Sequence, residues 1–139
     1  SVDGYIPDDY IADPRYKLEL YRRFAGLDYA GRGDLLDEII DRFGEPPEEV
    51  EVLWRVACLR ALCRLLHIRG ISVKQGEIRI TFAENAAVDP AALMQLIGEH
   101  QQYMQFKSGA KAQLIFRTVK LKTDSLTWLE KNLPRLALD

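Results

Sequence analysis

Apolar residues recur at helical spacing through the first half of the chain and predict three helices. The first is expected over residues 14–25, because Asp13 can accept hydrogen bonds from the first turn and Pro14 needs no donor there. The second is expected over residues 34–43, with Asp34 as its cap and Gly44 as the residue that ends it. The positions predicted to face inward are Leu18, Leu20, Tyr21, Phe24 and Ala25 in the first helix, and Leu35, Leu36, Ile39, Ile40 and Phe43 in the second.

The third predicted helix, over residues 48–66, is apolar on two opposite sides. One side gathers Val50, Trp54, Ala57, Ala61 and Leu65, and the other gathers Val52, Val56, Leu59, Cys63 and Leu66. A helix with two apolar faces is expected to be covered on both of them. We therefore predict that this helix is the structural spine of the protein and offers no surface for function.

Beyond residue 66 the apolar period changes from 3.6 to 2, which is typical of strands with one buried face. Ile71 and Val73 alternate with polar residues, as do residues 78–82 after a Lys-Gln-Gly-Glu turn, which predicts a hairpin. A second hairpin is expected from residues 104–106 and 112–116, with its last strand continuing through Val119 and Leu121. Asp89 with Pro90 predicts the start of a short helix, and a last helix is expected from about residue 123 to Pro134.

These elements predict an α+β fold, in which N-terminal helices are followed by a small, mostly antiparallel sheet and C-terminal helices. Residues 1–12 show no period and are interpreted as an extended entry segment. The chain has 139 residues, of which 47% are hydrophobic, so we expect a single domain over residues 1–139 with a real core. Without a membrane-length apolar run or a signal-peptide pattern, the expected localisation is cytoplasmic, with no membrane partner.

The sequence offers few groups for catalysis. Its two histidines, His67 and His100, have no ligand cluster near them, and each is interpreted as a capping or core histidine. Cys58 and Cys63 fall within a predicted helix and are interpreted as buried free thiols. No nucleotide-binding, metalloprotease or hydrolase motif is present. We expect no catalytic residue, no metal and no cofactor.

Acidic residues are concentrated in one stretch, although the net charge is only −2. Residues 28–51 hold nine acidic residues and two arginines, a local charge of −7. Such a surface repels a phosphate backbone and attracts a basic protein surface, so we do not expect nucleic acid to bind here. Basic residues form a C-terminal strip of Lys107, Lys111, Arg117, Lys120 and Lys122, which is interpreted as a solvated sheet edge, with nucleic-acid binding as the alternative.

Asp34, Asp37, Glu38 and Asp41 follow each other at spacings of three and four in the second predicted helix, and we call them the acidic ridge. Like charges at this spacing destabilise a helix by about 0.2–0.5 kcal/mol per pair. The helix dipole favours Asp34 near the N-terminus and disfavours Asp41 near the C-terminus. The ridge is therefore predicted to dock arginines of a partner protein, with an ordinary solvated face as the alternative.

Several segments of the chain resemble the C-terminal domain of bacterial transcription-repair coupling factor (Mfd). They are YIPDDYIADPR at residues 5–15, LELYRR at residues 18–23 and DRFG at residues 41–44, followed by a Pro-Glu-Glu-Val helix start and an Ala-Cys-Leu-Arg-Ala-Leu interior. The resemblance extends over essentially the whole chain and is strongest over residues 5–70. One departure is His67 with Ile68, where the family usually has Leu-Gly-Ile or a similar run.

The resemblance implies a non-catalytic domain cut from a larger ATP-driven DNA translocase, which removes stalled RNA polymerase and recruits the nucleotide-excision repair machinery. In the family, this domain packs on an N-terminal module that resembles UvrB and covers the surface that would bind UvrA. The factor thereby stays autoinhibited until RNA polymerase engages it. The implied partners are the UvrB-like module of the same protein and, through the parent protein, UvrA and RNA polymerase.

The resemblance also implies which residues make the contact. In the family, acidic residues of the helix that leads into DRFG form salt bridges with arginines of the UvrB-like module. Carried over to this sequence, these residues are Glu38 and Asp41, and we expect Asp34 and Asp37 to add flanking charge. The alternative function is a nucleic-acid-binding accessory domain that uses the basic C-terminal strip.

Overall fold

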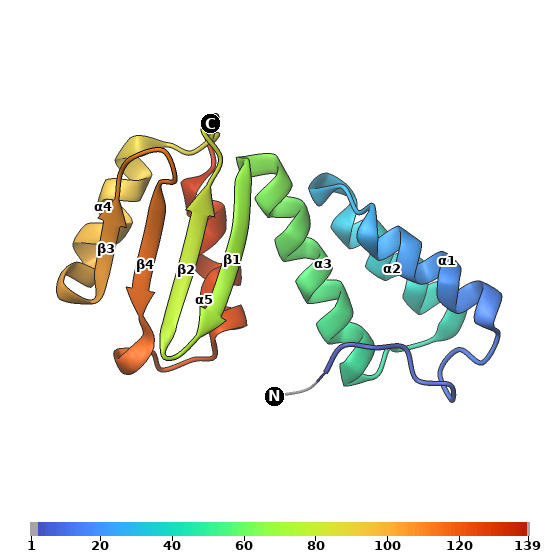
Figure 1. Cartoon of the computed structure of the whole chain (residues 1–139). Helices are drawn as coiled ribbons and strands as arrows, with labels where there is room; N and C mark the ends of the chain where they lie inside the picture. The colour runs from blue at the N-terminus through green and yellow to red at the C-terminus, as the bar shows by residue number, and fades with distance from the viewer. Residues whose placement is uncertain (1–2, 139) are drawn as a thin grey trace. The chain divides into compact units, whose positions relative to one another are not determined.

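The computed structural model describes residues 3–138, so residues 1 and 2 of the predicted entry segment, and residue 139, lie outside the described part. The chain divides into two compact units, Ser1–Ala61 and Leu62–Asp139, whose elements are labelled in Figure 1. The prediction that residues 1–139 act as a single domain concerns how these units work together, and it stays a prediction.

The first unit is helical. It holds α1 (Pro14–Ala25), a short 3-10 helix η1 (Tyr29–Gly31), α2 (Arg32–Phe43) and most of α3 (Glu48–Leu66). The predicted start of α1 is confirmed, because the Asp13 side chain accepts a hydrogen bond from the Arg15 backbone N–H at 2.9 Å. The prediction that Asp34 caps α2 is wrong, because the helix continues from η1 and already begins at Arg32.

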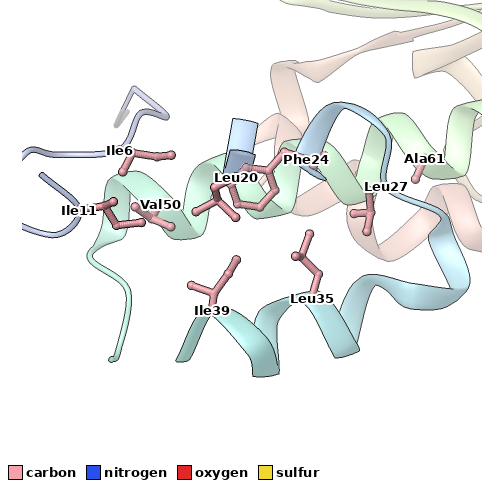
Figure 2. Packing of buried hydrophobic residues seen from close by; sticks show 10 residues of the cluster. Ile6, Ile11, Leu20, Phe24, Leu27, Leu35, Ile39, Val50 and Ala61 are labelled. Atoms are coloured by element: carbon pink, nitrogen blue, oxygen red, sulfur yellow. The ribbon is translucent and has the colours of Figure 1, made fainter. Parts of the chain in front are cut away.

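The core of this unit lies where α1, α2, α3 and the entry segment meet. Figure 2 shows Leu35 and Ile39 pointing from α2 toward Leu20 and Phe24 of α1. The remaining buried members of this core are Ile6, Ile11, Leu27, Val50, Ala57 and Ala61. The entry segment is therefore packed onto this core by its own apolar side chains. Buried Leu35 and Ile39 anchor α2, the helix that carries the acidic residues.

Three predicted inward positions of α1 are wrong. Leu18 is 52% exposed, Tyr21 is 39% exposed, and Ala25 is also exposed. Leu20 and Phe24 are the residues of α1 that turn toward the core, and Leu18 lies about 200° around the helix from Leu20. The Tyr21 hydroxyl still contacts the entry segment, since it accepts a hydrogen bond from the Ile6 N–H at 3.0 Å.

The two apolar faces of α3 are less buried than predicted. Val50, Ala57 and Ala61 of the first face are buried, and the half-buried Trp54 donates its indole N–H to the Arg32 carbonyl at 2.9 Å. Leu65, predicted on that face, is 56% exposed, because it lies in the last turn of the helix, beyond the end of the first unit at Ala61. On the second face only Leu66 is buried, and Val52, Val56, Leu59 and Cys63 are half-buried.

The second unit is built on a four-stranded antiparallel sheet, so the predicted α+β fold is confirmed. Its strands are β1 (Ile68–Lys74), β2 (Glu77–Phe82), β3 (Met104–Lys107) and β4 (Gln113–Arg117), in the order β1-β2-β4-β3. Its helices are α4 (Pro90–His100) and α5 (Ser125–Asn132), with 3-10 turns η2 (Gln101–Tyr103), η3 (Thr118–Lys120) and η4 (Leu133–Leu136). Both predicted hairpins are present, and the pairing of β2 with β4 joins them into one sheet.

One face of the sheet is apolar and is covered by α4 and α5, which lie behind the strands in Figure 1. Ile78, Ile80, Leu114 and Phe116 are buried on it, whereas Val73 at the edge is 52% exposed. The predicted continuation of β4 is wrong, because the chain turns at η3 and leaves Val119 74% exposed. Within residues 3–138, no helix is both long enough and apolar enough to cross a membrane.

The two histidines have the structural roles predicted for them. The ring of His100 lies 4.7 Å from that of Phe116 and 5.7 Å from that of Trp128, inside an aromatic cluster. His67 follows α3 with a positive φ of 55°, a conformation that usually favours glycine at the end of a helix. Its backbone N–H donates to the Arg64 carbonyl at 3.3 Å, so it closes the last turn of the helix.

Candidate docking surface

The acidic ridge lies on α2, opposite the side of the helix that is anchored in the core. Leu35 and Ile39 are 4% and 2% exposed and fix the rotation of the helix. Asp34, Asp37 and Asp41 consequently project into solvent and are exposed. Among residues 3–138, none forms a hydrogen bond or an ion pair with these three carboxylates. The structure therefore presents three unpaired negative charges along one side of α2.

Glu38 differs from the other three residues of the ridge, because it is already paired within the chain. Arg23 of α1 donates two hydrogen bonds to it, from Nη1 to Oε2 at 2.8 Å and from Nη2 to Oε1 at 3.1 Å. Arg42 also contacts Glu38 Oε2, at 3.4 Å, and Glu19 Oε1, at 3.2 Å. These four residues form a charge network that connects α1 to α2.

The network shifts the pKa values of Glu38 and Arg23 in opposite directions. The hydrogen bonds from Arg23 lower the pKa of Glu38 below its usual value of 4.5, and the charge of Arg42 acts in the same direction. The same bonds from Glu38 raise the pKa of Arg23. Both groups are therefore held in their charged forms, and a partner that binds Glu38 must compete with Arg23 for its carboxylate.

We expect Glu38→Gln to lower the melting temperature slightly at neutral pH, and the difference to disappear in acid. A carboxyl whose pKa is lowered by folding stabilises the protein above its unfolded pKa, near 4.5, and this stabilisation is lost as the pH falls through the folded pKa. Thermal unfolding of both proteins from neutral to strongly acidic pH measures this effect. A melting-temperature difference that persists at the lowest pH would show that the network does not depend on the charge of Glu38.

A groove runs between α1 and α2 next to the ridge, and we call it the α1–α2 groove. It has a volume of about 710 Å³. Its lining residues include Leu18, Arg22 and Arg23 from α1, and Asp34 and Glu38 from α2. The groove therefore divides the ridge, because Asp34 and Glu38 line it whereas Asp37 and Asp41 do not.

The basic C-terminal strip belongs to the second unit. Lys107 and Arg117 line a hollow of about 220 Å³ together with Glu77 and Arg79. Arg117 donates to the Gln102 carbonyl at 2.5 Å, and Arg79 donates to Glu77 at 2.7 Å. The guanidinium groups of Arg79 and Arg117 in this hollow are therefore already engaged within the chain.

The cysteines have the character of core residues. Cys58 and Cys63 form no disulfide with each other and are half-buried, less covered than predicted. Burial raises the pKa of the Cys63 thiol to about 11, so this side chain is protonated at neutral pH and is a poor nucleophile.

The α+β fold of this chain matches a solved structure over most of its length. That structure is described as the C-terminal domain of transcription-repair coupling factor, and the superposition has a TM-score of 0.76 with 23% sequence identity. It covers 97% of this chain and 85% of the other. The sequence model described as the TRCF domain matches residues 1–93, and the chain belongs to this family.

Similar proteins come from several bacteria. Transcription-repair-coupling factor of Bacillus subtilis is 31% identical over 134 residues, which are 94% of this chain. The factor of Mycobacterium tuberculosis is 45% identical over 64 residues, which are 45% of this chain. The matched regions span 11% and 5% of the lengths of these two relatives. The resemblance found in the sequence is thereby confirmed at the level of the family.

Sequence reasoning placed the four carboxylates on α2 and missed the partners of Glu38. The spacing of Arg42 four residues after Glu38 is a signal that could have identified that contact. Arg23 lies 15 residues before Glu38 on another helix, and no local pattern links them.

Proposed function

We propose that this chain is a non-catalytic docking domain of a transcription-repair coupling factor, and that it keeps the factor autoinhibited. In this proposal it packs on the UvrB-like N-terminal module of the same protein and covers the surface that would bind UvrA. RNA polymerase engagement rearranges the domains and releases it. The family supports the setting of this proposal, in transcription-coupled nucleotide-excision repair, and the acidic ridge supports the mode of contact.

The single observation that carries the proposal is the row of three exposed, unpaired carboxylates of Asp34, Asp37 and Asp41. They sit on a helix whose opposite side is anchored in the core, so their spacing is fixed before a partner arrives. Preorganised charges lose little entropy on binding, and they attract a basic surface from a distance. Arginines of the partner match them best, because a guanidinium can bind a carboxylate through two hydrogen bonds.

The structure changes the weight given to individual residues of the ridge. Asp41 remains a principal contact, with Asp37 and Asp34 beside it. Glu38 takes part only if an arginine of the partner joins or replaces Arg23 in the charge network. Exposed ion pairs contribute about 0.2–1 kcal/mol each, so the contact is weak enough to release, as autoinhibition requires.

We expect the chain to bind the isolated N-terminal module of the parent protein with an affinity that falls as salt is added. The double substitution Asp37→Lys with Asp41→Lys is expected to weaken binding by about tenfold or more, because two attractive charges become repulsive. Both side chains are exposed and unpaired, so the fold is not expected to change. Isothermal titration calorimetry at several salt concentrations measures the effect.

The matched control is Asp9→Lys with Glu84→Lys, which changes the net charge equally at two exposed positions that do not belong to the ridge. Glu38→Lys with Asp41→Lys serves as a second ridge variant, whose fold is checked by circular dichroism because Glu38 belongs to the charge network. If the control weakens binding as much as the ridge variants do, only net charge matters. If the ridge variants bind like the unchanged chain, the ridge is not the interface.

A further inference from the structure

The α1–α2 groove surrounds one exposed leucine with charges of both signs. Leu18 is 52% exposed in the middle of α1, although its neighbours Leu20 and Phe24 are buried. The buried Leu35 also lines the groove. The groove therefore extends from the exposed Leu18 side chain toward the core. A helix in a monomeric protein normally carries a polar residue at such a position.

The wall formed by α1 contains an unpaired cation. Arg15 in this wall is paired with Asp13 at 2.8 Å, and Arg23 is paired with Glu38. In the part of the chain that the structure describes, the Arg22 guanidinium forms no hydrogen bond or ion pair. Arg22 lies one turn from Leu18 on the same face of α1, so both side chains are presented together.

Unpaired anions also line the groove. Asp28 and Asp34 line the groove, are exposed, and form no side-chain hydrogen bond or ion pair within residues 3–138. Arg22 and these two aspartates line one groove without pairing with each other. A guest that fills the groove could therefore pair with charges of both signs at once and remove Leu18 from water.

We propose that the α1–α2 groove receives an amphipathic segment of the same partner that meets the acidic ridge. This inference rests on the proposed function, because it assigns a second contact to that partner. The segment presents an apolar side chain to Leu18, an acidic side chain to Arg22, and a lysine or arginine to Asp28 and Asp34. The ridge supplies attraction for a basic surface, whereas the groove requires a partner of mixed charge and fixes its register.

The groove proposal and simple attraction by the acidic ridge predict opposite effects of Arg22→Glu on binding affinity. A uniformly basic partner is repelled by Arg22, so Arg22→Glu would tighten the complex with such a partner. If the groove receives an acidic side chain at Arg22, the same substitution weakens binding, and we expect about a tenfold loss of affinity. Leu18→Ala is expected to weaken binding by about fivefold, because it removes the apolar contact at the centre of the groove.

The test is a titration of the N-terminal module of the parent protein with the unchanged chain, Arg22→Glu and Leu18→Ala. Arg69→Glu makes the same charge reversal, and Met94→Ala truncates another exposed apolar side chain, both in the second unit. These two control variants are expected to bind like the unchanged chain. Arg22 and Leu18 are both exposed, so their substitution leaves the core intact, which circular dichroism checks. Tighter or unchanged binding of Arg22→Glu overturns the groove proposal.

The ridge variant Asp37→Lys with Asp41→Lys separates this inference from the proposed function, because neither residue lines the groove. If the ridge variant loses affinity while Arg22→Glu and Leu18→Ala do not, the proposed function stands and the groove proposal fails. If the unchanged chain does not bind the N-terminal module in low salt, both fail. Loss of affinity in the groove variants and in the ridge variant supports both.

Discussion

Replacing Ile39 by alanine is expected to lower the free energy of unfolding of the first unit by about 2–5 kcal/mol. Ile39 is 2% exposed and belongs to the core cluster between α1 and α2, where Figure 2 shows it pointing toward Leu20. The truncation removes apolar contacts and leaves a cavity that the surrounding helices fill only in part. Because Ile39 lies between Glu38 and Asp41 in sequence, the same change loosens the helix that carries the acidic ridge.

Urea unfolding followed by tryptophan fluorescence measures this loss. The chain has two tryptophans, Trp54 in the first unit and Trp128 in the second, so a Trp128→Phe background leaves a reporter for the first unit alone. The matched control is Ile40→Ala, which removes the same atoms from the half-buried neighbouring position and is expected to cost less. Equal losses at the two positions would contradict the packing of α2 described above.

Replacing Gly44 by alanine is expected to destabilise the first unit by about 1–3 kcal/mol. Gly44 ends α2 with φ 88° and ψ −177°, a conformation that residues with a side chain rarely adopt. Its backbone is fixed on both sides, because its N–H donates to the Ile40 carbonyl at 2.9 Å and its carbonyl accepts the Tyr10 hydroxyl at 2.7 Å. Alanine at position 44 cannot adopt another φ without losing these hydrogen bonds, so the strain of its positive φ remains in the folded state.

Gly33→Ala is the matched control for this substitution. Gly33 lies in the first turn of α2 without a positive φ, and an added Cβ would meet no atom within 4 Å. Alanine there is expected to stabilise the protein by about 0.5–1 kcal/mol, since it limits the freedom of the unfolded chain. Opposite signs at Gly44 and Gly33 in the same urea assay support the assigned backbone conformation. Destabilisation at Gly33, or none at Gly44, would contradict it.

The positions that sequence reasoning predicted correctly depend on local chemistry. Asp13 with Pro14 and Asp89 with Pro90 start α1 and α4, and in each case the aspartate accepts from the backbone N–H two residues later. The predicted second hairpin is also present, and the structure places Met104 opposite Phe116 and Phe106 opposite Leu114. Caps and hairpins involve residues close in the chain, so their geometry follows from the sequence around them.

The positions that sequence reasoning missed depend on contacts between distant elements. The pattern of α1 put Leu18 among the core residues, but the packing of Leu20 and Phe24 against α2 rotates Leu18 outward. Trp128 was not singled out as a core residue, yet it is 7% exposed beside His100 and Phe116. In both cases the helix was predicted correctly, and the rotation of its surface was set by its neighbours.

The sequence by itself determined that acidic residues follow one side of α2, that Gly44 ends this helix, and that the chain resembles the domain family to which it belongs. Only the tertiary structure decided that Glu38 is paired with Arg23 whereas Asp34, Asp37 and Asp41 are unpaired. The reason is physical. A helix end depends on the backbone of a few neighbouring residues, whereas an ion pair between two helices depends on the distance and rotation at which their cores pack.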